Sequence, residues 1–161
     1  MTERYHFRPM SAEDLPLVRD WLRRPHVREW WGDPDEQFGL VSGDMHEPAM
    51  DRYIVSAQEQ PFGYLQSYRL TDWNICFGPQ PEATRGIDQM IGEPAMVGQG
   101  HGSGFIRAFS EGLLASGTPR VVVDPDPQNA RAIRAYEKAG FVRDKLVDTP
   151  DGISLLMVRD A

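Results

Sequence analysis

The sequence predicts a mixed α/β fold, of the α+β kind, on a mostly antiparallel central sheet. Successive strand patterns are joined by short turns, which favours antiparallel pairing of chain neighbours. A continuous apolar run at 120–124 is typical of a strand that is buried on both faces. A glycine-rich stretch at 95–104 separates a strand pattern from a helix pattern. Together these patterns predict the element order β-α-α-β-β-β-α-β-α-β-β.

The first part of the chain predicts one strand and two helices. Residues 5–10 are typical of a short strand. Ser11 or Asp14 can cap the helix that follows, because both side chains can accept hydrogen bonds from a first helical turn. Asp33 and Pro34 stand at the N-cap and N1 positions of a second short helix with a capping-box pattern.

The middle of the chain predicts three strands and the glycine-rich stretch. Segments 52–57 and 62–70 flank the residues QEQP and predict a β-hairpin. Residues 71–85 predict a loop, and 86–91 predict a strand. The helix pattern begins after the last glycine of the stretch. Its apolar face consists of Phe105, Ile106, Phe109 and Leu113.

The last part predicts a strand, a helix and a hairpin. The buried strand at 120–124 is followed by the turn PDPQN. Residues 130–139 predict a helix, and Gly140 stands where a helix-terminating glycine belongs. Segments 141–147 and 153–159 predict two strands joined by the turn DTPDG.

Length and composition predict one globular domain over residues 1–161. Hydrophobic residues make up 40% of the chain and charged residues 25%. The sequence contains neither a membrane-spanning run nor a secretory signal pattern, so we expect a cytoplasmic protein. Cys76 is the only cysteine, which excludes an internal disulfide, and the histidines lack the spacing of a zinc site. We expect no metal.

The charge of the chain limits its partners. The formal net charge is −7, with a pI of about 5.0. Nucleic-acid binding needs clustered Lys and Arg, so no nucleic-acid partner is expected, and no membrane partner either. A small cationic molecule remains compatible with this charge. The sequence does not fix the oligomeric state, and a monomer is the expectation.

The glycine-rich stretch indicates a phosphate site. Four glycines occupy alternate positions, which are Gly98, Gly100, Gly102 and Gly104. The stretch matches neither the dinucleotide fingerprint G-x-G-x-x-G nor the P-loop with its Gly-Lys-Ser/Thr. A glycine-rich loop at a helix N-terminus presents open N–H groups and the positive end of the helix dipole, which suit a phosphate or pyrophosphate. A flexible loop with a glycine-rich helix cap is the alternative.

Two motifs resemble those of the GCN5-related N-acetyltransferase (GNAT) superfamily. The residues QGHGSG resemble its acyl-CoA pyrophosphate loop, Gln-x-x-Gly-x-Gly, at Gln99, Gly102 and Gly104. The segment 124–141 resembles a later motif, Asn-x-x-Ala-x-x-x-Tyr-x-x-x-Gly-Phe, at Asn129, Ala132, Tyr136, Gly140 and Phe141. The resemblance implies the GNAT fold, with about seven strands flanked by about four helices. It also implies acetyl-CoA as the cofactor.

Within the superfamily the chain is most similar to aminoglycoside 6′-N-acetyltransferases of the bacterial resistance type. The similar stretches are EWWG (29–32), GYLQSY (63–68), RGIDQ (85–89), the segment 124–141 and TPDG (149–152). The similarity extends from Leu15 to Met157 and is weakest in 37–50 and 70–84. It implies acetyl transfer from acetyl-CoA to a primary amine of the antibiotic, by direct attack in a ternary complex, and hence antibiotic resistance.

The resemblance also implies which residues contact the cofactor. The strand residues beside the pantetheine arm are Gln89, Met90 and Ile91. The residues around the pyrophosphate are Gln99, Gly100, His101, Gly102, Ser103 and Gly104. Asn129 would contact the cofactor, and Tyr136 would donate a proton to the departing thiolate as general acid. A half-buried core tyrosine is the alternative for Tyr136.

The acceptor side should be acidic, because aminoglycosides carry several ammonium groups. By resemblance the acidic candidates are Asp72, Asp88, Asp124 and Asp151. Asp88 would orient the reacting amine and take its proton, directly or through water. Asp72 and Asp151 have simpler alternatives, as an exposed loop acid and a turn former. The other predicted acceptor residues are Trp31, which would pack on a sugar ring, and Tyr64, Gln66 and Tyr68.

Two other functions stay open. One is acylation of a different amine, such as a siderophore hydroxylamine or a protein N-terminus. The other is a non-catalytic module that binds acetyl-CoA.

Overall fold

The computed structural model describes residues 4–43, 45–70 and 76–161. Within them, seven strands form a sheet in the order β1-β2-β3-β4-β5-β7-β6, which confirms the predicted mixed α/β class. The chain divides into two compact units, residues 1–67 with 88–99 and residues 68–87 with 100–161. Strands β3 and β4 contribute residues to both. The expectation of one domain over residues 1–161 stays a prediction.

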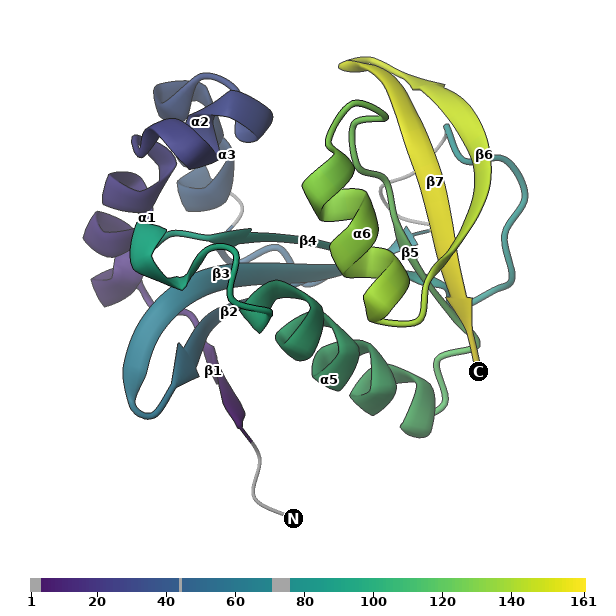
Figure 1. Cartoon of the computed structure of the whole chain (residues 1–161), viewed down its shortest axis with the longest axis horizontal. Helices are drawn as coiled ribbons and strands as arrows, with labels where there is room; N and C mark the ends of the chain where they lie inside the picture. The colour runs from purple at the N-terminus through teal and green to yellow at the C-terminus, as the bar shows by residue number, and fades with distance from the viewer. Residues whose placement is uncertain (1–3, 44, 71–75) are drawn as a thin grey trace. The chain divides into compact units, whose positions relative to one another are not determined.

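The first unit contains the N-terminal strands and helices (Figure 1). Its elements are β1 (Tyr5–Pro9), a 3-10 turn η1 (Ala12–Asp14), α1 (Leu15–Leu22), α2 (Pro25–Trp31), α3 (Pro34–Gly43), β2 (Met50–Ala57), most of β3 (Gln60–Arg69), the end of β4 (Arg85–Ile91) and η2 (Pro94–Met96). Strand β1 pairs with β2 in antiparallel register, from Tyr5 opposite Ala57 to Pro9 opposite Tyr53. Helices α1, α2 and α3 pack against one another.

Helix α2 is the element that the sequence does not predict. Pro25 occupies its first turn after the extended residue Arg24, and Gly32 ends it with a φ of 92°. The helix has 7 residues, of which Val27 alone is buried. So short an element with one buried side chain shows no apolar periodicity, so the sequence predicts two helices before β2 where the structure has three.

The predicted cap of α3 is confirmed. The Glu36 N–H donates to Oδ2 of Asp33 at 2.9 Å, which satisfies one open donor of the first turn. At the start of α1, Asp14 accepts a hydrogen bond from the Ser11 N–H at 2.9 Å and two from the Arg8 guanidinium. Asp14 occupies the N-cap position of α1, but its side chain accepts no hydrogen bond from the first turn of that helix, because it faces Ser11 and Arg8 instead.

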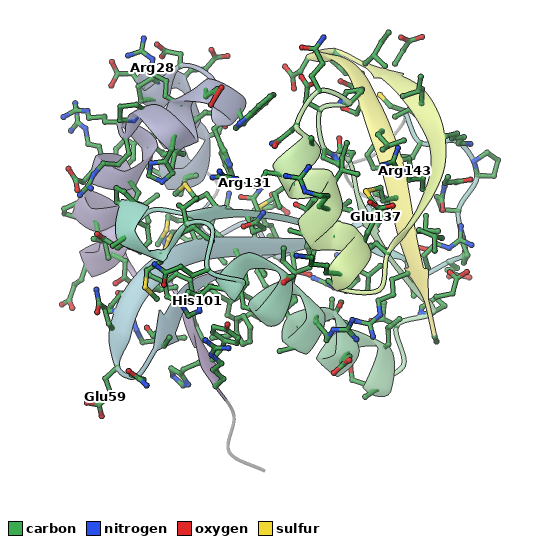
Figure 2. The ribbon with its side chains drawn as sticks, in the orientation of Figure 1. Arg28, Glu59, His101, Arg131, Glu137 and Arg143 are labelled. Atoms are coloured by element: carbon green, nitrogen blue, oxygen red, sulfur yellow. The ribbon has the colours of Figure 1, made fainter. Side chains whose placement is uncertain are left out.

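The β2–β3 hairpin is tighter than predicted. Its turn consists of Gln58 and Glu59, with left-handed φ angles of 51° and 67°. Figure 2 shows Glu59 at the tip of this hairpin. Positive φ at both positions suits the twist of a two-residue hairpin turn, although it is costly for residues other than glycine or asparagine.

The core of the first unit lies between α1, α2, α3 and the sheet. Its buried members are Val18, Trp21, Leu22, Val27, Val41, Ile54, Tyr64 and Met90. The Trp21 ring packs on the backbone of Gly92, where an added Cβ would lie 2.0 Å from the ring. Its Nε1 donates to Oε1 of Glu93 at 2.9 Å. Helix α1 thereby fixes the chain where it leaves β4.

The second unit contains the C-terminal elements (Figure 1). They are α5 (His101–Ala115), β5 (Arg120–Val123), α6 (Ala130–Lys138), β6 (Val142–Thr149) and β7 (Gly152–Asp160). Strand β4 pairs with β5 in parallel at Arg85 and Gly86. Strand β7 pairs antiparallel with both β5 and β6. The three valines of β5 are buried, which confirms the strand predicted from the apolar run.

Helix α5 packs against α6 and is attached to β7 (Figure 1). Arg159 on β7 donates to Oγ of Ser110 at 2.8 Å and to Oε1 of Glu111 at 3.2 Å. Helix α5, which follows the glycine-rich stretch, is thus held to β7 by the hydrogen bonds of Arg159 and to α6 by packing. None of the described helices combines the length and apolar character that a membrane span requires.

Candidate active site

Asp88 lies at the end of a chain of hydrogen-bonded side chains in the first unit. The Tyr64 hydroxyl donates to Oε1 of Gln66 at 2.7 Å. Nε2 of Gln66 then donates to Oδ2 of Asp88 at 2.9 Å. Tyr64 and Gln66 are two positions apart on β3, so their side chains leave the same face of the strand. Strand β3 therefore orients a carboxylate that belongs to β4.

Burial raises the pKa of the Asp88 carboxyl above its ordinary value of 3.8, because the charged form loses its water. The hydrogen bond from Gln66 and the attraction of the Arg52 guanidinium lower this pKa, but burial is the larger effect. Arg52 belongs to β2 and is itself buried. A carboxylate whose pKa is raised is a stronger base than an exposed aspartate. The arrangement can hold an ammonium group and accept a proton.

Helix α2 contacts β3 and β4, the two strands that carry the hydrogen-bonded side chains of Tyr64, Gln66 and Asp88. Trp31, its last residue, packs edge-on against the Tyr64 ring, with 6.2 Å between ring centroids and 73° between ring planes. Nε2 of His26 donates to the Ile91 carbonyl oxygen on β4 at 2.7 Å. Trp31 also packs against the core cluster, whereas Trp30 is 43% exposed. The packing of Trp31 on a sugar ring stays a prediction.

The peptide groups of β4 alternate between its two edges. The Gly92 N–H donates to the Phe62 carbonyl of β3 at 2.7 Å. By this alternation the peptide groups of Met90 also face β3, and those of Gln89 and Ile91 face the opposite edge. Of the three strand residues predicted to bind the cofactor, Gln89 and Ile91 thus direct their peptide groups away from β3, and the Ile91 carbonyl accepts the bond from His26. Their contact with the cofactor stays a prediction.

Helix α5 begins earlier than the sequence predicts. It starts at His101 with Gly100 as its N-cap, so Gly102 and Gly104 lie within its first turn. Glycine is about 1 kcal/mol worse than alanine in a helix, which conceals this turn in the sequence. Gly98 and Gly100 have φ angles of 76° and 83°, and an added Cβ would meet nothing within 4 Å at either. Backbone conformation, not crowding, requires glycine there.

The N–H groups at the start of α5 suit an anion, because a helix supplies no carbonyl one turn earlier for its first N–H groups. The Gly104 N–H is the first to bond within the helix, to the Gly100 carbonyl at 3.1 Å. The polar side chains around this first turn have local partners. Oγ of Ser103 donates to the Gly100 carbonyl at 3.2 Å, and Nε2 of Gln99 donates to the Ala95 carbonyl at 2.5 Å. His101, labelled in Figure 2, is 8% exposed. The backbone is therefore the part that fits the pyrophosphate of an acyl-CoA.

The motif around Tyr136 ends α6 in a Schellman turn. The Phe141 N–H donates to the Tyr136 carbonyl at 3.0 Å, and the Gly140 N–H donates to the Glu137 carbonyl at 3.0 Å. Gly140 has a φ of 101°, which confirms the predicted terminating glycine. The rings of Tyr136 and Phe141 pack at 64° with centroids 5.8 Å apart. Tyr136 is 6% exposed, so its ring is packed in the core. The role of its hydroxyl as a general acid stays a prediction.

The other end of α6 is capped by Asn129. Its Oδ1 accepts the Ala132 N–H at 3.2 Å, which leaves the amide Nδ2 and the second lone pair of Oδ1 for the predicted cofactor contact. Asn129 directly precedes the helix, as its predicted start at residue 130 implies. At the far end, Glu137 and Arg143 form an ion pair with 3.4 Å between Oε2 and Nε (Figure 2).

Two of the remaining predicted acidic residues lie in the second unit. Asp124 directly follows β5 and is partly buried. Asp151 is exposed in the β6–β7 turn, where its N–H donates to Oγ1 of Thr149 at 3.2 Å. Asp72 lies outside the described residues. The turn role of Asp151 is thus present, and its contact with a substrate stays a prediction.

The ring of Tyr68 lies against the backbone of Gly86. A Cβ added at Gly86 would lie 2.4 Å from Cζ of this ring. Glycine in the stretch RGIDQ is therefore explained by the ring that covers it.

Two residues that act on Asp88 or on its strand are absent from the predicted site. They are Arg52, which attracts the carboxylate, and His26, which binds β4. No motif or spacing signals either one, because His26 is 65 positions away from Ile91 in the sequence. Among the described residues, no group of three or more His, Cys, Asp or Glu is placed to hold a metal.

The chain is similar to known acetyltransferases over nearly its whole length. A model of the acetyltransferase (GNAT) domain matches residues 11–149. Aminoglycoside N(6′)-acetyltransferase type 1 of Klebsiella pneumoniae is 35% identical over 167 aligned positions, which cover 94% of this chain and 81% of that protein.

Solved structures agree with this similarity. AAC(6′)-Ib in complex with coenzyme A and kanamycin is 33% identical, with a TM-score of 0.87, and the match covers 97% of this chain and 94% of the other. A complex of AAC(6′)-Ib that contains acetyl-CoA has the same identity and TM-score, with 93% of that chain covered. Because the domain model spans most of the sequence and the fold agrees, the chain belongs to the GNAT family of acetyltransferases.

Proposed function

We propose that this protein is an aminoglycoside 6′-N-acetyltransferase that moves the acetyl group of acetyl-CoA to a primary amine and so confers resistance. The observation that carries the proposal is the oriented, partly buried Asp88 carboxylate on the strand that follows the family's pattern. The similarity to aminoglycoside N(6′)-acetyltransferases over 94% of the chain supports it. The requirement for acetyl-CoA favours a cytoplasmic location.

Asp88 is the proposed base. An amine attacks a thioester only when it is uncharged, and at neutral pH most aminoglycoside amines carry a proton. The carboxylate binds the ammonium form by a charge-assisted hydrogen bond and accepts its proton, directly or through one water. The raised pKa of Asp88 moves the acid limb of the pH–rate profile nearer to neutral pH.

The donor side is held by the backbone. The peptide groups of Gln89 and the N–H of Ile91 pair with the amides of the pantetheine arm, and an N–H of this strand polarises the thioester carbonyl. The pyrophosphate binds the first-turn N–H groups of α5, where the left-handed turns at Gly98 and Gly100 direct the chain into the helix. Acetyl-CoA supplies the activated acetyl group, and a direct transfer leaves free coenzyme A.

Tyr136 is the proposed general acid. A phenol with a pKa near 10 is protonated at pH 7 and can donate to the leaving thiolate. Tyr136→Phe keeps the ring that packs on Phe141 and removes only the hydroxyl. It should lower kcat by about tenfold to a hundredfold with little change in the KM for acetyl-CoA. An unchanged kcat would remove this role.

The acceptor is held by aromatic and acidic side chains. Trp31 packs on a sugar ring, and Tyr68 is a further aromatic contact of the antibiotic. Asp124 and Asp151 bind further ammonium groups. The negative net charge of −7 attracts a polycation before binding.

Thiol release tests the proposal. Free coenzyme A is measured with a thiol reagent after kanamycin or ribostamycin is mixed with acetyl-CoA and the protein, and NMR of the product locates the new acetyl group. We expect turnover and acetylation at the 6′ amine, and a loss of at least about a hundredfold in kcat for Asp88→Asn. Turnover only with hydroxylamines or peptide N-termini would assign another acceptor. Coenzyme A binding without turnover of any amine would indicate a non-catalytic module.

A further inference from the structure

We propose that Tyr64 and Gln66 are positioning residues for Asp88, which they hold through a hydrogen-bonded chain of fixed direction, and that they are not ligands of the substrate. The inference rests on the proposed function, because it concerns the base of that reaction. Tyr64 acts through Gln66, and Gln66 acts on the carboxylate. This differs from the expectation that both line the acceptor pocket.

The charge of Asp88 sets the direction of the chain. A carboxylate only accepts hydrogen bonds, so Gln66 turns its NH2 group toward Oδ2 of Asp88. The amide oxygen of Gln66 then faces the Tyr64 hydroxyl, which donates. A flipped amide would place its oxygen against the carboxylate, which loses the bond to Asp88 and puts two acceptors in contact. The two bonds therefore allow one arrangement while Asp88 is charged.

The far end of the chain is fixed by packing. Tyr64 is fully buried, belongs to the core cluster and contacts the Trp31 ring. A close-packed ring has no alternative rotamer within reach, so its hydroxyl stays in place. Gln66 is thus held at both ends. Its bond occupies Oδ2 of Asp88, and we assign Oδ1 to the reacting amine.

The hydrogen-bonded chain also controls when Asp88 gives up a proton. Three groups from the packed strands act on the carboxyl: the Gln66 amide and Tyr64 phenol of β3, and the Arg52 guanidinium of β2. Once Asp88 accepts the amine proton, Arg52 loses a charge partner and the chain loses its anionic acceptor. Both changes favour release of that proton to solvent. Gln66 and Tyr64 therefore favour the charged base that the next turnover needs.

The test compares pH profiles of kcat for three variants with one aminoglycoside, so that ionisation of the substrate is common to all. Gln66→Leu removes a hydrogen bond to a charged group, so the acid limb should move up by about one pH unit, and kcat at pH values on that limb should fall about tenfold. Tyr64→Phe should shift the limb in the same direction by less. Gln66→Glu keeps an acceptor for Tyr64 but places a second carboxylate beside Asp88, and should shift the limb most.

A second measurement does not depend on activity. The Asp88 carboxyl is titrated by 13C NMR in the protein without coenzyme A, and the Asp88→Asn variant assigns its signal. The pKa should rise in Gln66→Leu and, less, in Tyr64→Phe. Tyr5→Phe is the matched control, because Tyr5 is a buried tyrosine of the same unit that is not part of the hydrogen-bonded chain from Tyr64 to Asp88. It should leave both the NMR titration and the pH profile unchanged.

The outcomes separate the two proposals. Variants of Tyr64 and Gln66 that fold, keep the wild-type limb and pKa, and only raise the KM for the aminoglycoside would overturn the inference in favour of direct substrate contact. If Asp88→Asn remains fully active, the base assignment itself fails. If Asp88→Asn is inactive and Gln66→Leu has the wild-type profile, only the positioning role fails. Thermal unfolding of each variant shows whether a loss of kcat reflects misfolding.

Discussion

Gly86→Ala should displace the Tyr68 ring from its position against the backbone of Gly86 on β4. An added Cβ would lie 2.4 Å from Cζ of Tyr68 and 2.5 Å from its Cε2 and Oη. Ordinary contacts begin at 3.4 Å, so the ring must withdraw by about 1 Å. Tyr68 is 9% exposed, so its surroundings leave little room for this shift. Overpacking of this size costs about 1 to 3 kcal/mol of unfolding free energy.

Urea unfolding measures this cost, and a double-mutant cycle assigns it to the ring. In a Tyr68→Leu background the obstructing ring is gone, so Gly86→Ala should cost less than about 0.5 kcal/mol. Gly112→Ala is the matched control, because Gly112 lies in α5 with nothing within 4 Å of an added Cβ. It should stabilise the protein by about 0.5 to 1 kcal/mol.

The displaced ring should also affect binding. If Tyr68 lines the acceptor, Gly86→Ala raises the KM for the aminoglycoside several-fold and leaves the KM for acetyl-CoA unchanged. An unchanged unfolding free energy, or an equal loss with and without the Tyr68 ring, would refute the explanation given for this glycine.

Three further predictions concern stability. Gly140→Ala should lower the unfolding free energy by about 1 to 2 kcal/mol in urea, because the position has a φ of 101°, and a neutral result would deny the Schellman turn its role. Replacing the hairpin residues Gln58 and Glu59 by Asn and Gly should raise the free energy of unfolding by about 1 to 2 kcal/mol, since their φ angles of 51° and 67° are left-handed; a loss would contradict this. Asp88→Asn should stabilise the protein at neutral pH and not near pH 3.8, because a carboxyl whose folded-state pKa is raised stabilises below its unfolded value and loses that stability as pH rises through the folded value. A gain that is the same at both pH values would show that the charge of Asp88 is not its cause.

The sequence predicts those parts of the fold whose cause is local. The apolar run of β5, the Asp33 cap and the Gly140 turn each depend on residues within one element, and the structure confirms all of them. Helix α2 and the early start of α5 are hidden, because one is too short for periodicity and the other begins with glycines.

The site is predictable only in part, because its contacts join distant positions. Gln66 and Asp88 are 22 residues apart, and their meeting depends on the register of β3 and β4, which no local pattern encodes. The motifs identify Asp88 and Gln66 by resemblance, but not the hydrogen bond between them. His26 and Arg52 carry no motif, so only the structure places them near the same strand.

A crystal structure with coenzyme A and kanamycin bound together tests the central claim most directly. The account predicts that the 6′ nitrogen lies within hydrogen-bonding distance of Oδ1 of Asp88, that Gln66 still donates to Oδ2, and that the pyrophosphate contacts the first turn of α5. A 6′ nitrogen bound to other residues, with Asp88 facing a different part of the antibiotic, would contradict it.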